Sequence, residues 1–302
     1  MTPEDILSHR PRVLSQKQRE DYFARGYILV ERFVDAGWLE TLRAGVARLI
    51  ERSRAETKSG AVFDLEPGHT AAAPRLRRVS SPNDEDPAFW DFASKSPLGD
   101  LLQDLLGPSV KFHQSKLNFK WAKGGTEVKW HQDAPFFPHT NAAVLTVGLY
   151  MNDCGMDQGP LGCIPGSHER EVFDHYAPDG SWAGFIQQRD LPRVALDKAE
   201  YLCGPAGSLT LHNYRTVHGS EPNRSDLGRP LLLNVMSAAD AFPYTFNPLK
   251  TRYYQQCIRG EPARVAHHDP RPLPVPPDWS GGYTSIFEYQ QGAAAGMGGG
   301  MM

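Results

Sequence analysis

Between Pro108 and residue 240 the chain is a succession of short strand-forming runs, and this stretch most limits the folds open to it. The first run is long and contains neither Gly nor Pro, and the third is rich in β-branched and apolar residues. Short strands separated by Gly and Pro are typical of a sandwich, barrel or jelly roll. We therefore predict an all-β core. The runs cover residues 111–121, 127–130, 143–151, 207–212 and 231–236.

The residues before this core have helical patterns instead. Residues 15–26 start at a potential N-cap, Ser15, and stop at a glycine, while 35–50 carries apolar side chains at helical spacing. Residues 87–106 also indicate a helix. Between them, residues 54–84 are polar and irregular, which predicts a long loop that could serve as a lid.

These patterns predict one domain over residues 1–290. Its helical N-terminal part covers 1–107, the strand-rich core about 108–240, and a C-terminal extension 241–290. Within the core, the mixed polar segment 168–202 is interpreted as a surface insertion. The tail 291–302, rich in Gly and Ala, is expected to be disordered.

Charge and cysteine content exclude several classes of function. A net charge of −3 and a pI near 6.4 give no electrostatic footprint for nucleic acid or an anionic membrane. No run of eighteen apolar residues and no signal peptide is found, so we expect a cytoplasmic protein. No Cys-x-x-Cys pair occurs among the four cysteines, which favours free thiols over a zinc site. The oligomeric state cannot be read from the sequence. The cysteines are Cys154, Cys163, Cys203 and Cys257.

His131 and Asp133 follow a strand-like run at a spacing of two, and His218 follows a later strand. Alternate residues of a strand share a face, so His131 and Asp133 could both reach one metal while Gln132 points away. Two imidazoles and one carboxylate suit iron(II) and leave open positions for a small molecule and oxygen. A lone His-x-Asp is more often structural, and His212 competes with His218 as the third ligand.

Arg229 begins an apolar strand eleven positions after His218, and its guanidinium could bind a carboxylate beside the metal. A surface arginine is the simpler alternative. Ser220 could add a hydroxyl to the same carboxylate. Lysines of the strand runs (Lys116, Lys120 and Lys129) could suit a carboxylated substrate, but we favour a solvated strand face for them. Candidate pocket walls are Phe136, Phe137, Tyr150, Tyr214 and Phe242.

Together with Gly159–His168, whose sequence is GPLGCIPGSH, these motifs resemble the phytanoyl-CoA dioxygenase family. The resemblance implies a double-stranded β-helix (a jelly-roll or cupin-like fold) with N-terminal and peripheral helices. It also implies iron(II), 2-oxoglutarate and O2, with Ser220 and Arg229 as the carboxylate-binding pair. Family members that halogenate replace the metal-binding carboxylate with a small residue, so Asp133 implies oxidation without halogen.

The run 112–120 is similar to that of ectoine hydroxylases. That similarity implies a 2-oxoglutarate contact for Asn118 and a substrate contact for Gln114. The residues after Asp133, namely 134–139 (APFFPH), depart from the aromatic-acidic stretch of those enzymes. The substrate is therefore left open by the resemblance.

The predicted function is a 2-oxoglutarate-dependent dioxygenase that hydroxylates an unactivated C–H bond of a small-molecule metabolite and releases succinate and CO2. The predicted machinery consists of His131, Asp133, His218 and Arg229, with Gln114, Phe137 and Tyr214 toward the substrate. One alternative is a zinc- or manganese-dependent isomerase or hydrolase on a similar barrel. Another is a binding barrel without activity.

Overall fold

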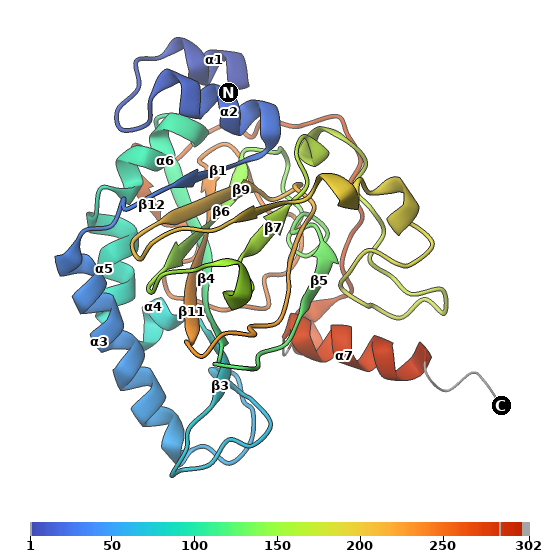
Figure 1. Ribbon diagram of the computed structural model, residues 1–302. Coiled ribbons are helices and arrows are strands. Elements are labelled where there is room, and N and C mark those ends of the chain that lie inside the picture. The colour runs from blue at the N-terminus through green and yellow to red at the C-terminus, as the bar shows by residue number, and fades with distance from the viewer. Residues whose placement is uncertain (1, 284, 298–302) are drawn as a thin grey trace.

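Two antiparallel sheets face each other in the computed structural model, which describes residues 2–283 and 285–297 (Figure 1). The major sheet has the order β1-β9-β6-β11-β4-β3-β2, and β12 pairs with β4 beside this path. Its strands are β1 (Tyr27–Val30), β2 (Phe63–Leu65), β3 (Leu76–Ser80), β4 (Val110–Lys120), β6 (Val144–Tyr150), β9 (Leu209–Asn213), β11 (Arg229–Ala238) and β12 (Cys257–Arg259).

The minor sheet has four short strands in the order β5-β10-β7-β8. Every ladder in both sheets pairs antiparallel, as in a sandwich closed by hairpins and crossovers. The strands are β5 (Val128–His131), β7 (Leu161–Cys163), β8 (Glu200–Leu202) and β10 (His218–Ser220).

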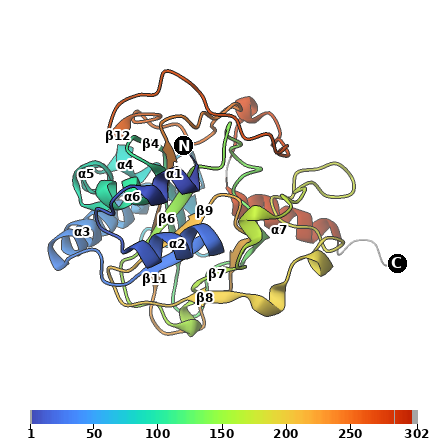
Figure 2. The ribbon, with the colours of Figure 1, turned by 90° about the horizontal axis from the view of Figure 1, so that it is seen from above.

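Helices flank the sheets on two sides, and both views separate them clearly (Figures 1 and 2). The N-terminal helices α3, α5 and α6 lie on one side of the molecule, and α7 lies on the other. The helices are α1 (Pro3–Ser8), α2 (Gln16–Arg25), α3 (Ala36–Arg52), α4 (Pro82–Glu85), α5 (Pro87–Lys95), α6 (Leu98–Leu106) and α7 (Ile286–Met297). Short 3-10 turns are Ser53–Ala55, Met156–Gln158, Ser167–Glu169, Leu191–Arg193, Leu196–Lys198 and Trp279–Gly281.

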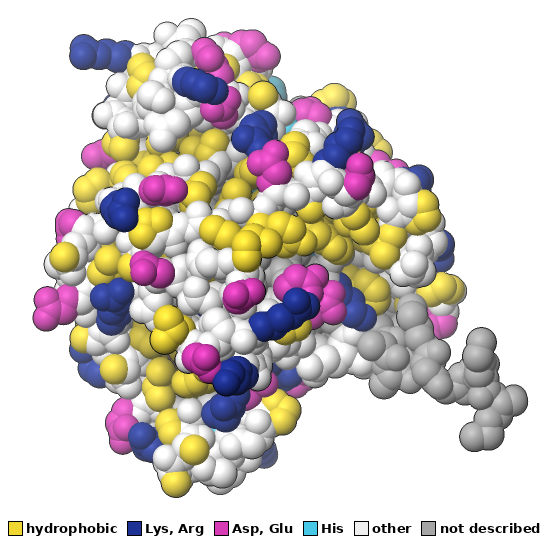
Figure 3. All heavy atoms as spheres, viewed as in Figure 1, with side chains coloured by type: hydrophobic (Ala, Val, Ile, Leu, Met, Phe, Trp, Pro, Cys, Tyr) yellow, Lys and Arg dark blue, Asp and Glu magenta, His cyan; other side chains and the backbone are white. Residues whose placement is uncertain are grey.

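The hydrophobic core joins the N-terminal helices to the major sheet. Leu42 and Leu101 from the helices and Leu117 and Leu232 from the strands are fully buried members of one cluster. Burial of such side chains stabilises the fold by roughly 2 kcal/mol each. On the face shown in Figure 3, basic and acidic side chains are interspersed, in keeping with the small net charge. None of the helices in the described part of the chain is long and apolar enough to cross a membrane.

Helix α2 and the core strands lie where the sequence predicts them. Helix α2 starts after Ser15, whose hydroxyl accepts the N–H of Gln18, and ends at Gly26 with a φ of 84°. The strong strand patterns correspond to β4, β5, β6, β9 and β11.

Three expectations from the sequence are wrong. Residues 54–84 are not one long loop, because β3 pairs with β4 there and β2 pairs with β3, so both strands extend the major sheet. The segment 168–202 is not a plain surface insertion, because side chains such as Phe173 and Ile186 are buried in a cluster of their own. Helix α7 occupies residues 291–297, where a disordered tail was expected, and residues 298–302 lie outside the described residues.

Candidate metal centre and adjoining cavities

Two strands of the minor sheet bring the predicted metal ligands together. His131 ends β5 and His218 begins β10, and the two residues are direct partners in the antiparallel ladder. One ligand atom from each of His131, Asp133 and His218 lies within 4.8 Å of the others, and all three residues are buried. Two imidazoles and one carboxylate on one side of an ion are the donor set of non-haem iron(II).

Hydrogen bonds to the backbone orient both imidazoles. The Nδ1–H of His131 donates to the carbonyl of Lys129 at 2.8 Å, and that of His218 donates to the carbonyl of Thr216 at 2.9 Å. This arrangement fixes the tautomer and leaves each Nε2 free to bind a metal. Asp133 Oδ2 accepts the hydroxyl of Thr146 at 2.7 Å, which leaves Oδ1 for the ion.

A turn, and not strand alternation, positions Asp133. Strand β5 ends at His131, and the carbonyl of Asp133 accepts the N–H of Phe136 at 2.9 Å in the turn that follows. The expectation that both ligands sit on one strand face is therefore wrong, although the spacing still brings them together.

Gln132 points away from the metal site, as predicted, and it fixes the turn. It is fully buried. Its amide donates to the carbonyls of Arg215 at 2.6 Å and Glu171 at 3.1 Å, and its oxygen accepts the N–H of Phe173 at 2.9 Å. The segment 168–202 thus holds the metal-binding turn from behind.

Replacing Gln132 by leucine should weaken metal binding by about 10–100-fold, the usual effect of losing a group that orients the ligands. The substitution leaves two carbonyls and one N–H without partners, so the turn between His131 and Asp133 loosens. Calorimetric titration of the metal-free protein with iron(II) measures the change. Gln187→Leu is a matched control, because Gln187 is also buried but its side chain bonds, among the described residues, to the nearby Phe185 carbonyl alone. Equal losses in both variants would contradict a specific role for Gln132.

Burial keeps the two imidazoles neutral. It lowers the pKa of His131 to about 4 and that of His218 well below the ordinary value for histidine. Burial would raise the pKa of Asp133, but His212, His218 and Lys116 together hold it well below its usual range. Neutral imidazoles beside an ionised carboxylate are the protonation states that bind a divalent metal.

His212, the competing third ligand, lies behind the carboxylate. Its Nε2 is 3.4 Å from Asp133 Oδ2, and its ring centroid is 4.2 Å from that of His218. Among the described residues, the ligand atoms that lie close enough together to hold one metal ion belong to His131, Asp133 and His218, and His212 is not among them. The geometry therefore favours His218 as the third ligand.

A cavity between the two sheets extends from the triad to Arg229 at the start of β11. Arg229 is only 3% exposed, and its Nε and Nη1 have no hydrogen-bond partner among the described residues. A buried guanidinium without a counter-charge is unfavourable, so we expect an anion to bind beside Arg229. The alternative of a surface arginine is wrong.

Asn118 and Ser220 line this cavity, and a buried basic side chain donates a hydrogen bond to each of them. Arg78 Nε donates to Asn118 Oδ1 at 3.2 Å, and Lys120 Nζ donates to Ser220 Oγ at 2.8 Å. Burial and the nearby Arg229 lower the pKa of Lys120 to about 6. With these oxygens occupied as acceptors, the Asn118 amide and the Ser220 hydroxyl can donate to a carboxylate.

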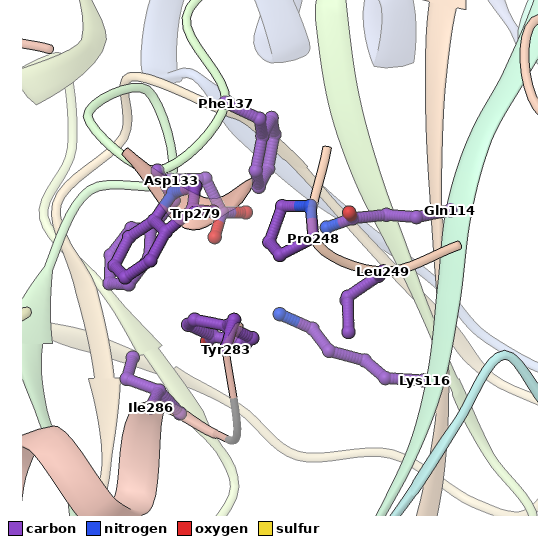
Figure 4. A pocket seen from close by; sticks show the side chains of 10 residues that line it. Gln114, Lys116, Asp133, Phe137, Pro248, Leu249, Trp279, Tyr283 and Ile286 are labelled. Atoms are coloured by element: carbon purple, nitrogen blue, oxygen red, sulfur yellow. The ribbon is translucent and has the colours of Figure 1, made fainter. Parts of the chain in front are cut away.

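A second cavity lies on the other side of Asp133 (Figure 4). Gln114 and Phe137 line it as predicted, together with Phe136. Tyr214 does not line either cavity, because its ring packs near Phe137 and His139 while its hydroxyl donates to the Asn141 carbonyl. Tyr150 and Phe242 also lie outside the lining of both cavities.

Several lining residues were missed or misread in the sequence. Lys116 and Lys120 face the interior between the sheets, so the solvated strand face favoured for them is wrong. Arg78 lies in the segment taken as a loop. Trp279 and Tyr283 come from the C-terminal extension and close the second cavity.

Comparison with known proteins gives a consistent result. The model of the family described as Phytanoyl-CoA dioxygenase (PhyH) matches residues 22–231. The chain is 32% identical over 278 residues to a probable alpha-ketoglutarate-dependent hypophosphite dioxygenase from Stutzerimonas stutzeri, covering 91% of this chain and 96% of that protein. It is 26% identical over 262 residues to an ectoine dioxygenase from Bordetella bronchiseptica, covering 78% and 79% of the two chains.

Among solved structures, EctD from S. alaskensis with 2-oxoglutarate and 5-hydroxyectoine matches with a TM-score of 0.66 at 22% identity. The match covers 88% of this chain and 92% of that chain. This likeness confirms the predicted jelly-roll fold, a double-stranded β-helix with helices around it.

Proposed function

Since the chain belongs to the phytanoyl-CoA dioxygenase family and is an iron- and 2-oxoglutarate-dependent dioxygenase, we propose that it hydroxylates a C–H bond of a small metabolite. This family membership favours an oxygenase over the zinc- or manganese-dependent isomerase or hydrolase that the sequence left as an alternative. In the proposed reaction one oxygen atom of O2 enters the C–H bond and the other enters succinate, while 2-oxoglutarate loses CO2.

The observation that carries the proposal is the buried guanidinium of Arg229 in the cavity that the triad also lines, with no partner for its Nε and Nη1 among the described residues. We assign the far carboxylate of 2-oxoglutarate to Arg229, with the hydroxyl of Ser220 and the amide of Asn118 as further donors. A bidentate guanidinium–carboxylate pair is both strong and directional. It would orient the keto acid end toward His131, Asp133 and His218.

Iron(II), when bound, supplies the open coordination positions and the redox chemistry that O2 activation needs. The protein positions the reactants and excludes water. Leu231 and Leu233 of β11 and Phe119 of β4 give the cosubstrate cavity apolar walls between its polar ends. On the substrate side we assign contacts to Gln114 and Phe137, whose side chains line the second cavity next to Asp133.

Oxidation of a P–H bond is a second candidate, favoured by the 32% identity to the probable hypophosphite dioxygenase over nearly its whole length. Insertion of one oxygen atom into hypophosphite would give phosphite, with succinate and CO2 as the other products. The chemistry at the triad is the same as for C–H hydroxylation, so only the substrate cavity distinguishes the two candidates.

Succinate release from iron-loaded protein tests the proposal. Without substrate we expect slow turnover of 2-oxoglutarate, and the right substrate should stimulate it at least about tenfold, because substrate binding completes the site. The panel contains hypophosphite, ectoine, L-proline and other small amino acids, and mass analysis looks for a gain of one oxygen. If wild-type protein never consumes 2-oxoglutarate across this panel, the proposed function fails.

A further inference from the structure

Lys116 places a half-buried ammonium group in the second cavity, which we assign to the substrate. Its side chain extends from β4 and lines both cavities, and Figure 4 shows Nζ directed into the open space between Tyr283 and Leu249. Among the described residues no hydrogen bond or ion pair holds this nitrogen, and partial burial lowers the pKa of Lys116 to about 8. An ammonium group partly removed from water without a partner is unfavourable, so an anionic ligand would stabilise it.

The carboxylate found among the described lining residues of this cavity cannot serve as the permanent partner of Lys116. Asp133 also lines the cavity, but it is a metal ligand, and Thr146 already donates to one of its oxygens. Once a divalent cation is bound, the charge of Asp133 is matched by the metal. Lys116 then lacks a counter-charge on the substrate side.

A second donor without a partner faces the same cavity from the C-terminal segment. Trp279 is 3% exposed, and its Nε1 has no hydrogen-bond partner among the described residues. Aromatic contacts fix its ring, with centroids 5.8 Å from Trp182 and 5.6 Å from Tyr289. Indole N–H groups are donors only, so this one also calls for an acceptor.

The far carboxylate of 2-oxoglutarate does not account for these donors. Lys116 and Lys120 both lie on β4 and are four residues apart, about 13 Å along a strand. Arg229 pairs with Lys120 in the ladder, at the opposite end of the site from Gln114. The carboxylate assigned to Arg229 therefore lies well away from Trp279.

We propose that the substrate is a small oxyanion, bound through Lys116 Nζ and the indole N–H of Trp279. This assignment rests on the proposed function and names its substrate class. Phe136, Phe137 and Leu249 supply apolar walls around the two donors. The cavity thus suits one carboxylate or phosphorus oxyanion on a short apolar body, with the bond to be oxidised directed toward the triad.

The test measures binding and does not require turnover. Protein loaded with iron(II) and 2-oxoglutarate without oxygen is titrated calorimetrically with propionate, methylphosphonate and the neutral analogue propionamide. We expect the two anions to bind at least about tenfold more tightly than propionamide, as for a hydrogen-bonded charge. Comparable affinity for propionate and propionamide would overturn the proposal.

Variants assign the effect to the two donors. Lys116→Met should abolish the preference for propionate over propionamide, while Lys116→Arg should retain it because the charge remains. Trp279→Phe keeps an aromatic ring without the N–H and should weaken anion binding about tenfold. Lys95→Met is the matched control, since it removes one exposed lysine charge from α5 on the outer side of the fold.

The outcomes separate this inference from the proposed function. If Lys116→Met binds propionate as wild type does, or weakens only 2-oxoglutarate binding, the anion site is not at Lys116. Succinate release without any preference for anions contradicts the substrate class alone. Absence of succinate release from the wild type contradicts the proposed function, whereas the calorimetric result still decides the anion site.

Discussion

Replacing His131 by alanine is expected to abolish 2-oxoglutarate turnover. Succinate release should fall by more than about 100-fold, because the loss of a residue that only orients a metal ligand already costs up to about that factor. The imidazole is a direct member of the triad, it is buried, and its Nδ1 is already committed to the Lys129 carbonyl. Its loss leaves two ligands for a metal that needs three. Succinate release and the iron content of the purified variant measure the effect.

Parallel substitutions at His218 and His212 sharpen this prediction. His218→Ala should lose iron as completely as His131→Ala. His212→Ala should retain iron, since His212 approaches the carboxylate of Asp133 at 3.4 Å and does not join the converging ligand atoms. Retention of iron by His218→Ala together with its loss in His212→Ala would move the third ligand to β9.

Replacing Arg229 by lysine is expected to weaken 2-oxoglutarate binding by about 10–100-fold, the value of a hydrogen bond to a charged group. Lysine keeps the positive charge but offers a point charge in place of the two parallel N–H donors. The amino group of lysine also reaches less far into the cavity than a guanidinium does. Ser220 and Asn118 are held by their own hydrogen-bond partners, so they cannot move to make up for this difference. The dissociation constant of 2-oxoglutarate, measured by calorimetry with iron(II) and without oxygen, reports the change.

Arg224→Lys is the matched control for this measurement, because the Arg224 side chain is 75% exposed and lies in the turn between β10 and β11. It should bind 2-oxoglutarate as wild type does. If Arg229→Lys also binds with wild-type affinity, Arg229 has no part in holding the cosubstrate, and its missing partner must be another anion.

The sequence predicted those parts of the fold that are determined locally. Helix α2 lies between a capping serine and Gly26, whose φ of 84° glycine adopts easily. Strands β6 and β11 are strongly apolar, and they occupy the centre of the major sheet. The triad could be predicted because the order and spacing of its motifs are specific, while the role of Arg229 stays a prediction.

What the sequence could not predict depends on contacts between distant segments. Strand β3 is polar, and it is a strand because Arg78 pairs with Asn118 of β4 in the ladder. Alternation along β4 shows that Lys116 and Lys120 share a face, but not that the minor sheet encloses that face. Trp279 reaches the site from more than 140 residues beyond Asp133, through a proline-rich segment with no periodic pattern.

The same strand, β4, serves both cavities, and its inward-facing side chains follow one another at a spacing of two. Gln114 lines the cavity proposed for the substrate, Lys116 lines both cavities, and Asn118 and Lys120 line the cavity proposed for 2-oxoglutarate. A bulge in the pairing with β11, between Val235 and Met236, lies at the substrate end of the strand. Mutations near that bulge can therefore change which compound is oxidised, while the regular half of the ladder preserves the machinery for 2-oxoglutarate. In this architecture substitutions can change the substrate specificity while the residues proposed to bind 2-oxoglutarate stay in place.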